Sequence, residues 1–141
     1  MSFQIVLLPL FVQVVLTMAV GYLLFTARTA ALRAKQVRWQ QIALGEPAWP
    51  PVALARANAF RNQFELPVLF YVLTILEIIT QHADFIFIIL AWIFVLTRIA
   101  HAAVHVTSNH VPTRGILYGV GGIALFVAWI IFMVRIVLAL P

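Results

Sequence analysis

Four long apolar stretches leave this chain few ways to fold. They run over residues 3–27, 54–80, 85–107 and 116–140 and use most of the 141 residues. Each has the roughly 20 mainly apolar residues that a helix needs to cross a bilayer. The apolar share of the composition, 65%, agrees with this interpretation. The sequence therefore predicts an all-α integral membrane protein in which four transmembrane helices form a single domain over residues 1–141.

Basic residues predict the orientation of this bundle. Most of them gather around the first connection and one follows the third span: Arg28, Arg33, Lys35, Arg38, Arg56, Arg61 and Arg114. The second connection has Glu77 and Asp84 but no basic residue. Because basic loops stay in the cytoplasm, we expect the first and third connections there and both termini on the opposite side. We expect Arg135 to extend alone toward that outer side, and the short loops favour a bacterial inner membrane.

The composition also narrows the possible functions. The chain has no cysteine, so a thiol in its chemistry must come from a ligand. Its net charge of +5 matches the topology and an affinity for anionic lipid, and without a soluble basic surface nucleic-acid binding is not expected. His101 and His105 have a spacing that suits a metal, but no third ligand is apparent, so no metal site is predicted. A channel or transporter is disfavoured because no polar path reaches the outer face.

Two polar stripes interrupt the apolar helices at a matched depth. Each has spacings of three and four residues and so shares one helix face: Asn58, Asn62 and Glu65 on the second helix, and Arg98, His101 and His105 on the third. At ~1.5 Å per residue, Glu65 and Arg98 both lie ~21–23 Å from the outer helix ends. An unpaired charge is costly in lipid, so we expect Glu65 to pair with Arg98. We also expect Pro67 to kink the helix beside them.

Small residues suggest how the helices pack. Gly115, Gly119 and Gly122 predict a smooth face for close helix contact, unless they only reflect the abundance of glycine in transmembrane helices. Gln13 and Thr17 share a face of the first helix and are expected to form hydrogen bonds between helices.

The segments that carry the polar stripes resemble a known family. "RNQFELPVLFY" and "RIAHAAVHVTSNHVPTRG" are similar to the second-helix and third-helix signatures of the MAPEG family, the membrane-associated proteins in eicosanoid and glutathione metabolism. The resemblance rests most on Asn62 and Glu65, combined with Arg98 and Arg114. It implies a homotrimer of four-helix bundles with glutathione held between neighbouring protomers at the cytoplasmic side.

The resemblance also implies roles for individual residues. Arg114 keeps the position from which the family stabilises a glutathione thiolate, so it is implied as the catalytic residue. The implied glutathione site consists of Asn62, Glu65, Arg61, Arg98, His101 and His105. The chain departs from the glutathione-using pattern at three positions: Asn58 replaces an arginine, and His101 and His105 replace tyrosines.

Two functional hypotheses follow. The first is a membrane-embedded glutathione-dependent transferase or peroxidase that acts on lipophilic electrophiles entering from the bilayer, with glutathione as co-substrate. The alternative is a non-catalytic MAPEG-like membrane protein that binds a lipid or an anionic small molecule, or that scaffolds partner membrane proteins. In the alternative, Glu65 and Arg98 would only satisfy each other's buried charge, and Arg114 would only anchor its helix at the interface.

We predict that a reporter active only in the cytoplasm stays silent when it is fused to the C-terminus and is active when it is inserted after Gly45. The basic residues around the first connection hold that connection in the cytoplasm. A reporter active only outside the cytoplasm is the control and should give the reverse pattern. Strong cytoplasmic activity of the C-terminal fusion would contradict the predicted orientation.

Overall fold

The protein is all-helical in a computed structural model that describes residues 2–45 and 48–139. Its helices are α1 (Phe3–Arg33), α2 (Trp39–Ile42), α3 (Pro51–Arg61), the 3₁₀ turn η1 (Asn62–Phe64), α4 (Leu66–Ile79), α5 (Phe85–Val106) and α6 (Val111–Leu138). By length and composition, the described residues provide four spans that can cross a membrane, with α3, η1 and α4 acting as one of them. The prediction of an all-α membrane protein with four transmembrane helices is confirmed.

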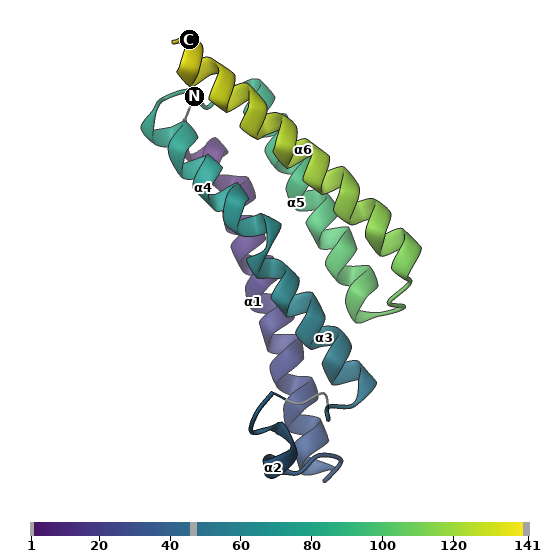
Figure 1. Ribbon diagram of the computed structural model, residues 1–141. Helices are drawn as coiled ribbons and strands as arrows, with labels where there is room; N and C mark the ends of the chain where they lie inside the picture. Colours follow the sequence, from purple (N-terminus) through teal and green to yellow (C-terminus); the bar gives the residue numbers. More distant parts are fainter. Residues whose placement is uncertain (1, 46–47, 140–141) are drawn as a thin grey trace.

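The spans lie side by side along one long axis (Figure 1). α5 packs most extensively on α6, and α1 packs on α3, α4 and α5. The start of α1 and the end of α6 lie together with the turn of residues 80–84, and we call this the terminal end of the bundle. The described parts of the first connection, residues 34–45 and 48–50, and the connection of residues 107–110 lie toward the other end, which we call the loop end.

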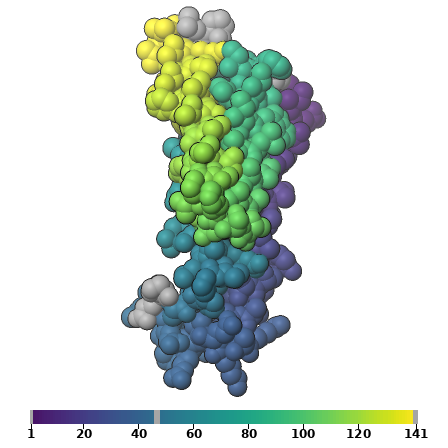
Figure 2. Space-filling view, turned by 90° about the vertical axis from the view of Figure 1, so that its right-hand side faces the viewer, coloured from purple at the N-terminus to yellow at the C-terminus, as the bar shows by residue number. Residues whose placement is uncertain are grey.

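α1 is longer than the predicted helix and carries basic residues out of the bundle. Its 31 residues would extend ~46 Å, against a hydrocarbon core of ~30 Å. Figure 2 shows the segments around residues 30–45 and 48–60 projecting beyond the α5–α6 pair at the loop end. The Arg28 guanidinium lies 5.0 Å from the centre of the Trp49 ring. This end of α1 therefore has the basic and aromatic character of a membrane interface.

The second span is interrupted beside Pro67, as expected, but the interruption is a break and not only a kink. α3 ends at Arg61, η1 follows, and Glu65 adopts non-helical backbone angles, φ −96° and ψ −106°, before α4 begins. Proline has no N–H to donate, and its ring crowds the preceding turn. The helix therefore restarts with Pro67 in its first turn.

A buried amide pair holds α1 against this break. Gln13 is fully buried and its Nε2 donates to Oε1 of Gln63 at 2.9 Å, while Gln63 Nε2 donates to the carbonyl of Ala59 at 3.3 Å. Gln13 thus forms the expected bond between helices. Thr17 instead donates within α1, to the Gln13 carbonyl.

Several helix ends differ from the predicted ones. α3 begins at Pro51, not at residue 54, and α6 begins at Val111, with Pro112 in its first turn, not at residue 116. Proline suits this position because the N–H it lacks would have no partner there. The predicted end of the last helix at residue 140 lies outside the described residues, as does Pro47 of the first connection.

The close approach of α5 and α6 depends on a glycine that the sequence pattern did not single out. A Cβ atom on Gly121 would lie 2.5 Å from Oγ1 of Thr97, so a larger residue would force Thr97 or the helices to move. Gly122 lies beside Leu66, while Gly115 and Gly119 have no described atom within 4 Å of a Cβ position. Within this protomer, the predicted Gly115–Gly119–Gly122 face is therefore not the helix contact.

Arg135 does not extend alone toward solvent, as the sequence suggested, but joins α6 to the start of α5. Its Nη2 lies 2.6 Å from Oδ2 of Asp84, and its Nη1 donates to the His82 carbonyl at 3.4 Å. Asp84 Oδ1 accepts from the backbone N–H of Phe87 and so caps α5. Partial burial alone would raise the pKa of the Asp84 carboxyl, but the hydrogen bonds from Arg135 and Phe87 lower it below its ordinary value.

We predict that Asp84→Asn lowers the free energy of unfolding in detergent by about 0.5–1 kcal/mol near neutral pH. The estimate is small because the Arg135 and Asp84 side chains are 18% and 35% exposed and water screens the pair. The lowered pKa means that the ionised carboxylate stabilises the fold. Its contribution is fully present above the ordinary pKa of about 4 and is lost as the pH falls through the lower folded value.

Thermal unfolding followed by circular dichroism from about pH 7 to pH 3 measures this effect. The difference between wild type and Asp84→Asn should be constant above about pH 4 and should shrink below it. Arg28→Gln, at the loop end, is the matched control and should keep the acid response of the wild type. A difference that grows at acid pH would contradict the stabilising role of the Asp84 carboxylate.

Candidate functional site

The break in the second span places Asn62 beside α5 and Glu65 beside α6. Asn62 starts η1 and Glu65 occupies the non-helical position before α4, while His101 and His105 lie one turn apart on the facing side of α5. The two histidines are each 3% exposed and their ring centres are 5.6 Å apart. The structure therefore brings together four of the residues that the sequence singled out.

His101 connects three chain segments through its ring nitrogens. Its Nδ1 lies 2.9 Å from the carbonyl oxygen of Arg114, which can only accept, so Nδ1 carries a proton. Its Nε2 lies 3.2 Å from the amide of Asn62. In the neutral ring Nε2 is an acceptor, and the amide nitrogen of Asn62 must then face His101.

The Asn62 amide lies between His101 and Glu65. In one orientation its nitrogen lies 3.2 Å from His101 Nε2. Turned over, its nitrogen lies 3.1 and 3.2 Å from the two Glu65 oxygens, and its oxygen lies 3.2 Å from His101 Nε2. In either orientation Asn62 links Glu65 of the second span to His101 of α5.

Arg98 does not pair directly with Glu65, so that prediction is wrong. The described residues contain one ion pair, Asp84 with Arg135. Instead, the phenol ring of Tyr118 lies between the two charges. Arg98 Cζ is 4.6 Å from the Tyr118 ring centre, and the Tyr118 hydroxyl donates to Glu65 Oε2 at 3.3 Å.

Arg98 is among the most deeply buried side chains of the described chain, with 1% of its surface exposed. Its Nε and Nη2 atoms have no hydrogen-bond partner among the described residues. The aromatic faces of Tyr118 and Phe94 and the more distant charge of Glu65 are what compensate the guanidinium. A buried cation with unused donors suits either an anionic ligand or a second protein chain.

Arg114 lies at the edge of this cluster, in the first turns of α6. Its backbone carbonyl holds His101, and its charge acts on both His101 and His105. The Arg114 side chain donates from Nη1 to Oδ1 of Asn109 in the preceding turn. That contact orients the guanidinium beside the two histidines while leaving it partly exposed.

The arginines of the second span and Asn58 make fewer contacts with this cluster. Arg61 is exposed and makes no hydrogen bond or ion pair with another described residue, and Asn58 is exposed as well. Arg56 is bound to α1, because its Nη1 donates to the Leu23 carbonyl at 2.9 Å. Arg56 therefore does not take over the role of the arginine that the glutathione-using pattern has at position 58.

Tyr118 is the site residue that the sequence reasoning missed. It lies four residues after Arg114, so both side chains fall on nearby faces of α6. Its ring centre is also 5.7 Å from that of His101. The spacing from Arg114 was an available signal, but a tyrosine in an apolar helix is common near membrane interfaces.

An apolar groove of about 490 Å³ begins beside this cluster and runs between α4 and α6. Its near end is lined by Leu66, which follows Glu65 in the chain, and by Gly122, one turn after Tyr118. Trp129 and Met133 line its far end. Its lining has the character of a site for an apolar molecule.

The comparisons with known proteins bear on this arrangement. The model of the MAPEG family matches residues 6–134. The chain belongs to the MAPEG family. No curated protein and no solved structure matches it. The match covers all of the residues described for this cluster, so the MAPEG resemblance of the two signature segments is confirmed, together with the membrane association that the family implies.

The cluster can be compared with what a glutathione ligand needs. Glutathione carries an ammonium group, two carboxylates and a thiol, so it requires an acceptor, cations and a group that stabilises sulfur. Glu65 is an exposed carboxylate, Arg61 and Arg114 are accessible cations, and Arg98 has unused donors. The residue types therefore fit a MAPEG glutathione site at the loop end.

We predict that Tyr118→Phe lowers the free energy of unfolding by about 1 kcal/mol and Tyr118→Leu by about 2–3 kcal/mol. Phenylalanine keeps the aromatic face beside Arg98 and loses only the bond to Glu65, whereas leucine loses both. Thermal unfolding in detergent gives the values. Tyr22→Leu, on an exposed face of α1, is the control and should change stability by less than about 0.5 kcal/mol. Equal losses for the two Tyr118 variants would show that Arg98 does not depend on the ring.

Proposed function

We propose that the chain is a membrane-embedded glutathione-dependent transferase or peroxidase acting on lipophilic electrophiles. The observation that carries the proposal is the meeting of Asn62 and Glu65 with His101, whose ring is held by the carbonyl of Arg114, in a chain of the MAPEG family. Glutathione supplies the thiol that a chain without cysteine lacks.

Arg114 is the proposed catalytic residue. A thiol reacts as its thiolate, and a nearby cation lowers the thiol pKa. Arg114 stays charged at any working pH and is partly exposed at the mouth of the cluster. The bound thiol loses its proton to water at the loop end, the sulfur attacks the electrophilic carbon, a C–S bond forms, and the leaving group departs with its electron pair.

The remaining site residues bind and orient glutathione. Glu65 accepts from the ammonium group, while Arg61 and Arg98 attract the carboxylates. Asn62 and His101 adjust to the bound peptide through the orientation of the Asn62 amide, and His105 contributes a second ring beside it. The electrophile enters from the bilayer through the apolar groove between α4 and α6.

Assembly and location complete the proposal. We propose a homotrimer of single-domain chains in a bacterial inner membrane, with the loop end in the cytoplasm. The uncovered surface at Gly115 and Gly119 supports contact with a second chain. The basic residues around the first connection support the orientation.

We predict that Arg114→Ala abolishes conjugation of glutathione to a hydrophobic chloronitrobenzene while assembly stays intact. Each pKa unit of thiolate stabilisation corresponds to about 1.4 kcal/mol, so even a partial role should lower the rate measurably. Arg98→Ala should instead weaken folding or glutathione binding. Turnover in lipid nanodiscs, with size-exclusion chromatography for assembly, measures both effects.

Two controls make this experiment specific. Arg33→Ala removes another loop-end arginine that lies outside the cluster and should leave the rate unchanged. Gly122→Leu narrows the apolar groove and should raise KM for the hydrophobic substrate with little change in glutathione binding. Unchanged turnover in an assembled Arg114→Ala protein would remove this mechanism. A wild-type protein that neither conjugates glutathione nor shows a thermal shift with it would favour the non-catalytic alternative.

A further inference from the structure

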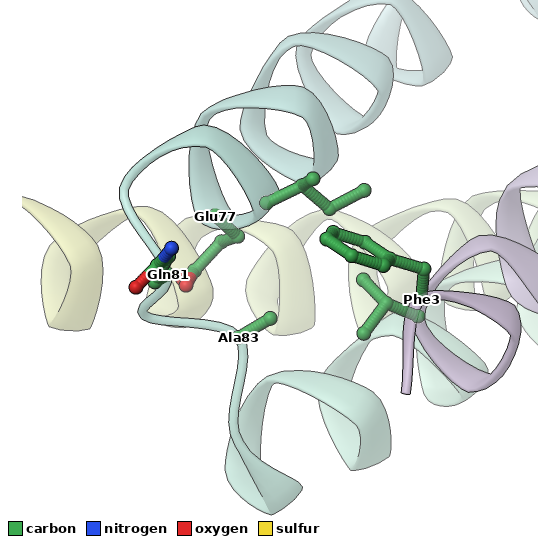
Figure 3. Close-up of a pocket in the computed structure, with 6 residues that line it drawn as sticks. Phe3, Glu77, Gln81 and Ala83 are labelled. Atoms are coloured by element: carbon green, nitrogen blue, oxygen red, sulfur yellow. The ribbon is translucent and has the colours of Figure 1, made fainter. Parts of the chain in front are cut away.

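A polar cavity lies at the terminal end, at the opposite end of the bundle from the cluster of Asn62, Glu65 and His101. It has a volume of about 330 Å³ and is lined by Phe3, Val6, Glu77, Ile78, Gln81 and Ala83. Figure 3 shows Phe3 reaching in from α1, Glu77 from α4, and Gln81 and Ala83 from the turn that follows α4. Glu77 lies twelve residues after Glu65, or ~18 Å along a helix, so the cavity is not part of the first site.

Glu77 is the unusual member of this cavity. Its side chain is 1% exposed, and its Oε2 atom has no hydrogen-bond partner among the described residues. Arg135, whose charge acts on Glu77, is already bound to Asp84 at 2.6 Å and to the His82 carbonyl. A buried carboxylate without its own counterion is costly. The Glu77 carboxylate would therefore be stabilised by a positively charged group bound in the cavity.

The chemistry of the lining selects the kind of cation. Mg²⁺ and Ca²⁺ need six or more oxygen ligands, whereas the side chains of this lining offer one carboxylate and one amide oxygen. A primary ammonium group has three N–H donors and is satisfied by fewer acceptors. The ring of Phe3 adds an aromatic face that attracts a cation, and Val6 and Ile78 suit an apolar body attached to it.

The position of the cavity indicates where such a group would come from. Glu77 lies in the last turn of α4, two residues before the helix ends at Ile79. For a helix that spans the bilayer, we expect such a position at the edge of the hydrocarbon core, at the level of lipid headgroups. From the unpaired buried carboxylate and this lining, we propose that the cavity binds a primary ammonium group, carried by an aminophospholipid headgroup or by a soluble alkylamine.

Thermal unfolding of the full chain in detergent tests the proposal with defined probes. Hexylammonium and phosphatidylethanolamine should raise the unfolding midpoint of the wild type by roughly 5 °C at about 100 times their Kd. Tetramethylammonium and phosphatidylcholine have no N–H donors and should not. A rise with phosphatidylethanolamine alone identifies a lipid site, and a rise with both identifies a general ammonium site.

Variants then assign the effect to the cavity. Glu77→Gln has the same shape without the charge and should lose the ligand-induced rise, and Ala83→Phe fills the cavity without touching the carboxylate and should lose it too. Glu65→Gln removes an acid at the other end of the bundle, does not disturb the Arg135–Asp84 pair, and should keep the rise. If Glu77→Gln does not fold, the loss or retention of the rise in Ala83→Phe still shows whether the ligand binds in the cavity. Equal rises in wild type and in both cavity variants, or no rise in the wild type, would overturn the proposal.

Discussion

Pro67 interrupts the second span inside the membrane, and the geometry of the loop-end cluster depends on that interruption. Hydrocarbon offers no water to satisfy backbone groups, so a helix break survives there only where side chains and neighbouring helices replace the lost bonds. Buried Gln63 lies within the break and is bound by Gln13 of α1. Because the helix stops between Arg61 and Leu66, Glu65 leaves the regular helical path and approaches Tyr118 of α6.

The two ends of the bundle treat buried charge in different ways. At the terminal end, Asp84 and Arg135 form a direct pair that also caps α5, and Glu77 remains unpaired beside them. At the loop end, Arg98 is compensated by an aromatic ring and by the more distant Glu65 charge. The loop-end arrangement leaves donors of Arg98 unused, which suits a ligand-binding site better than a purely structural pair.

Much of the candidate site could be predicted because helical spacing alone places residues on common faces. Asn62, His101 and His105 meet as their spacings imply. The Glu65–Arg98 pair failed because equal depth along two helices says nothing about the rotation of each helix about its own axis. Tyr118 could not be selected over other aromatic residues, since its role exists only where α4, α5 and α6 come together.

The sequence by itself determined the number of spans and the membrane as solvent, because long apolar runs have no other stable environment. It also indicated that the second span is disturbed at Pro67, since proline cannot continue the hydrogen-bond ladder, although it predicted a kink where the structure has a break. Tertiary structure decided the rest: that Gly121 and not Gly119 lies at the α5–α6 contact, that Arg135 meets Asp84, and that a ring separates Arg98 from Glu65. These outcomes depend on the rotation and separation of whole helices, which close packing of many side chains sets jointly.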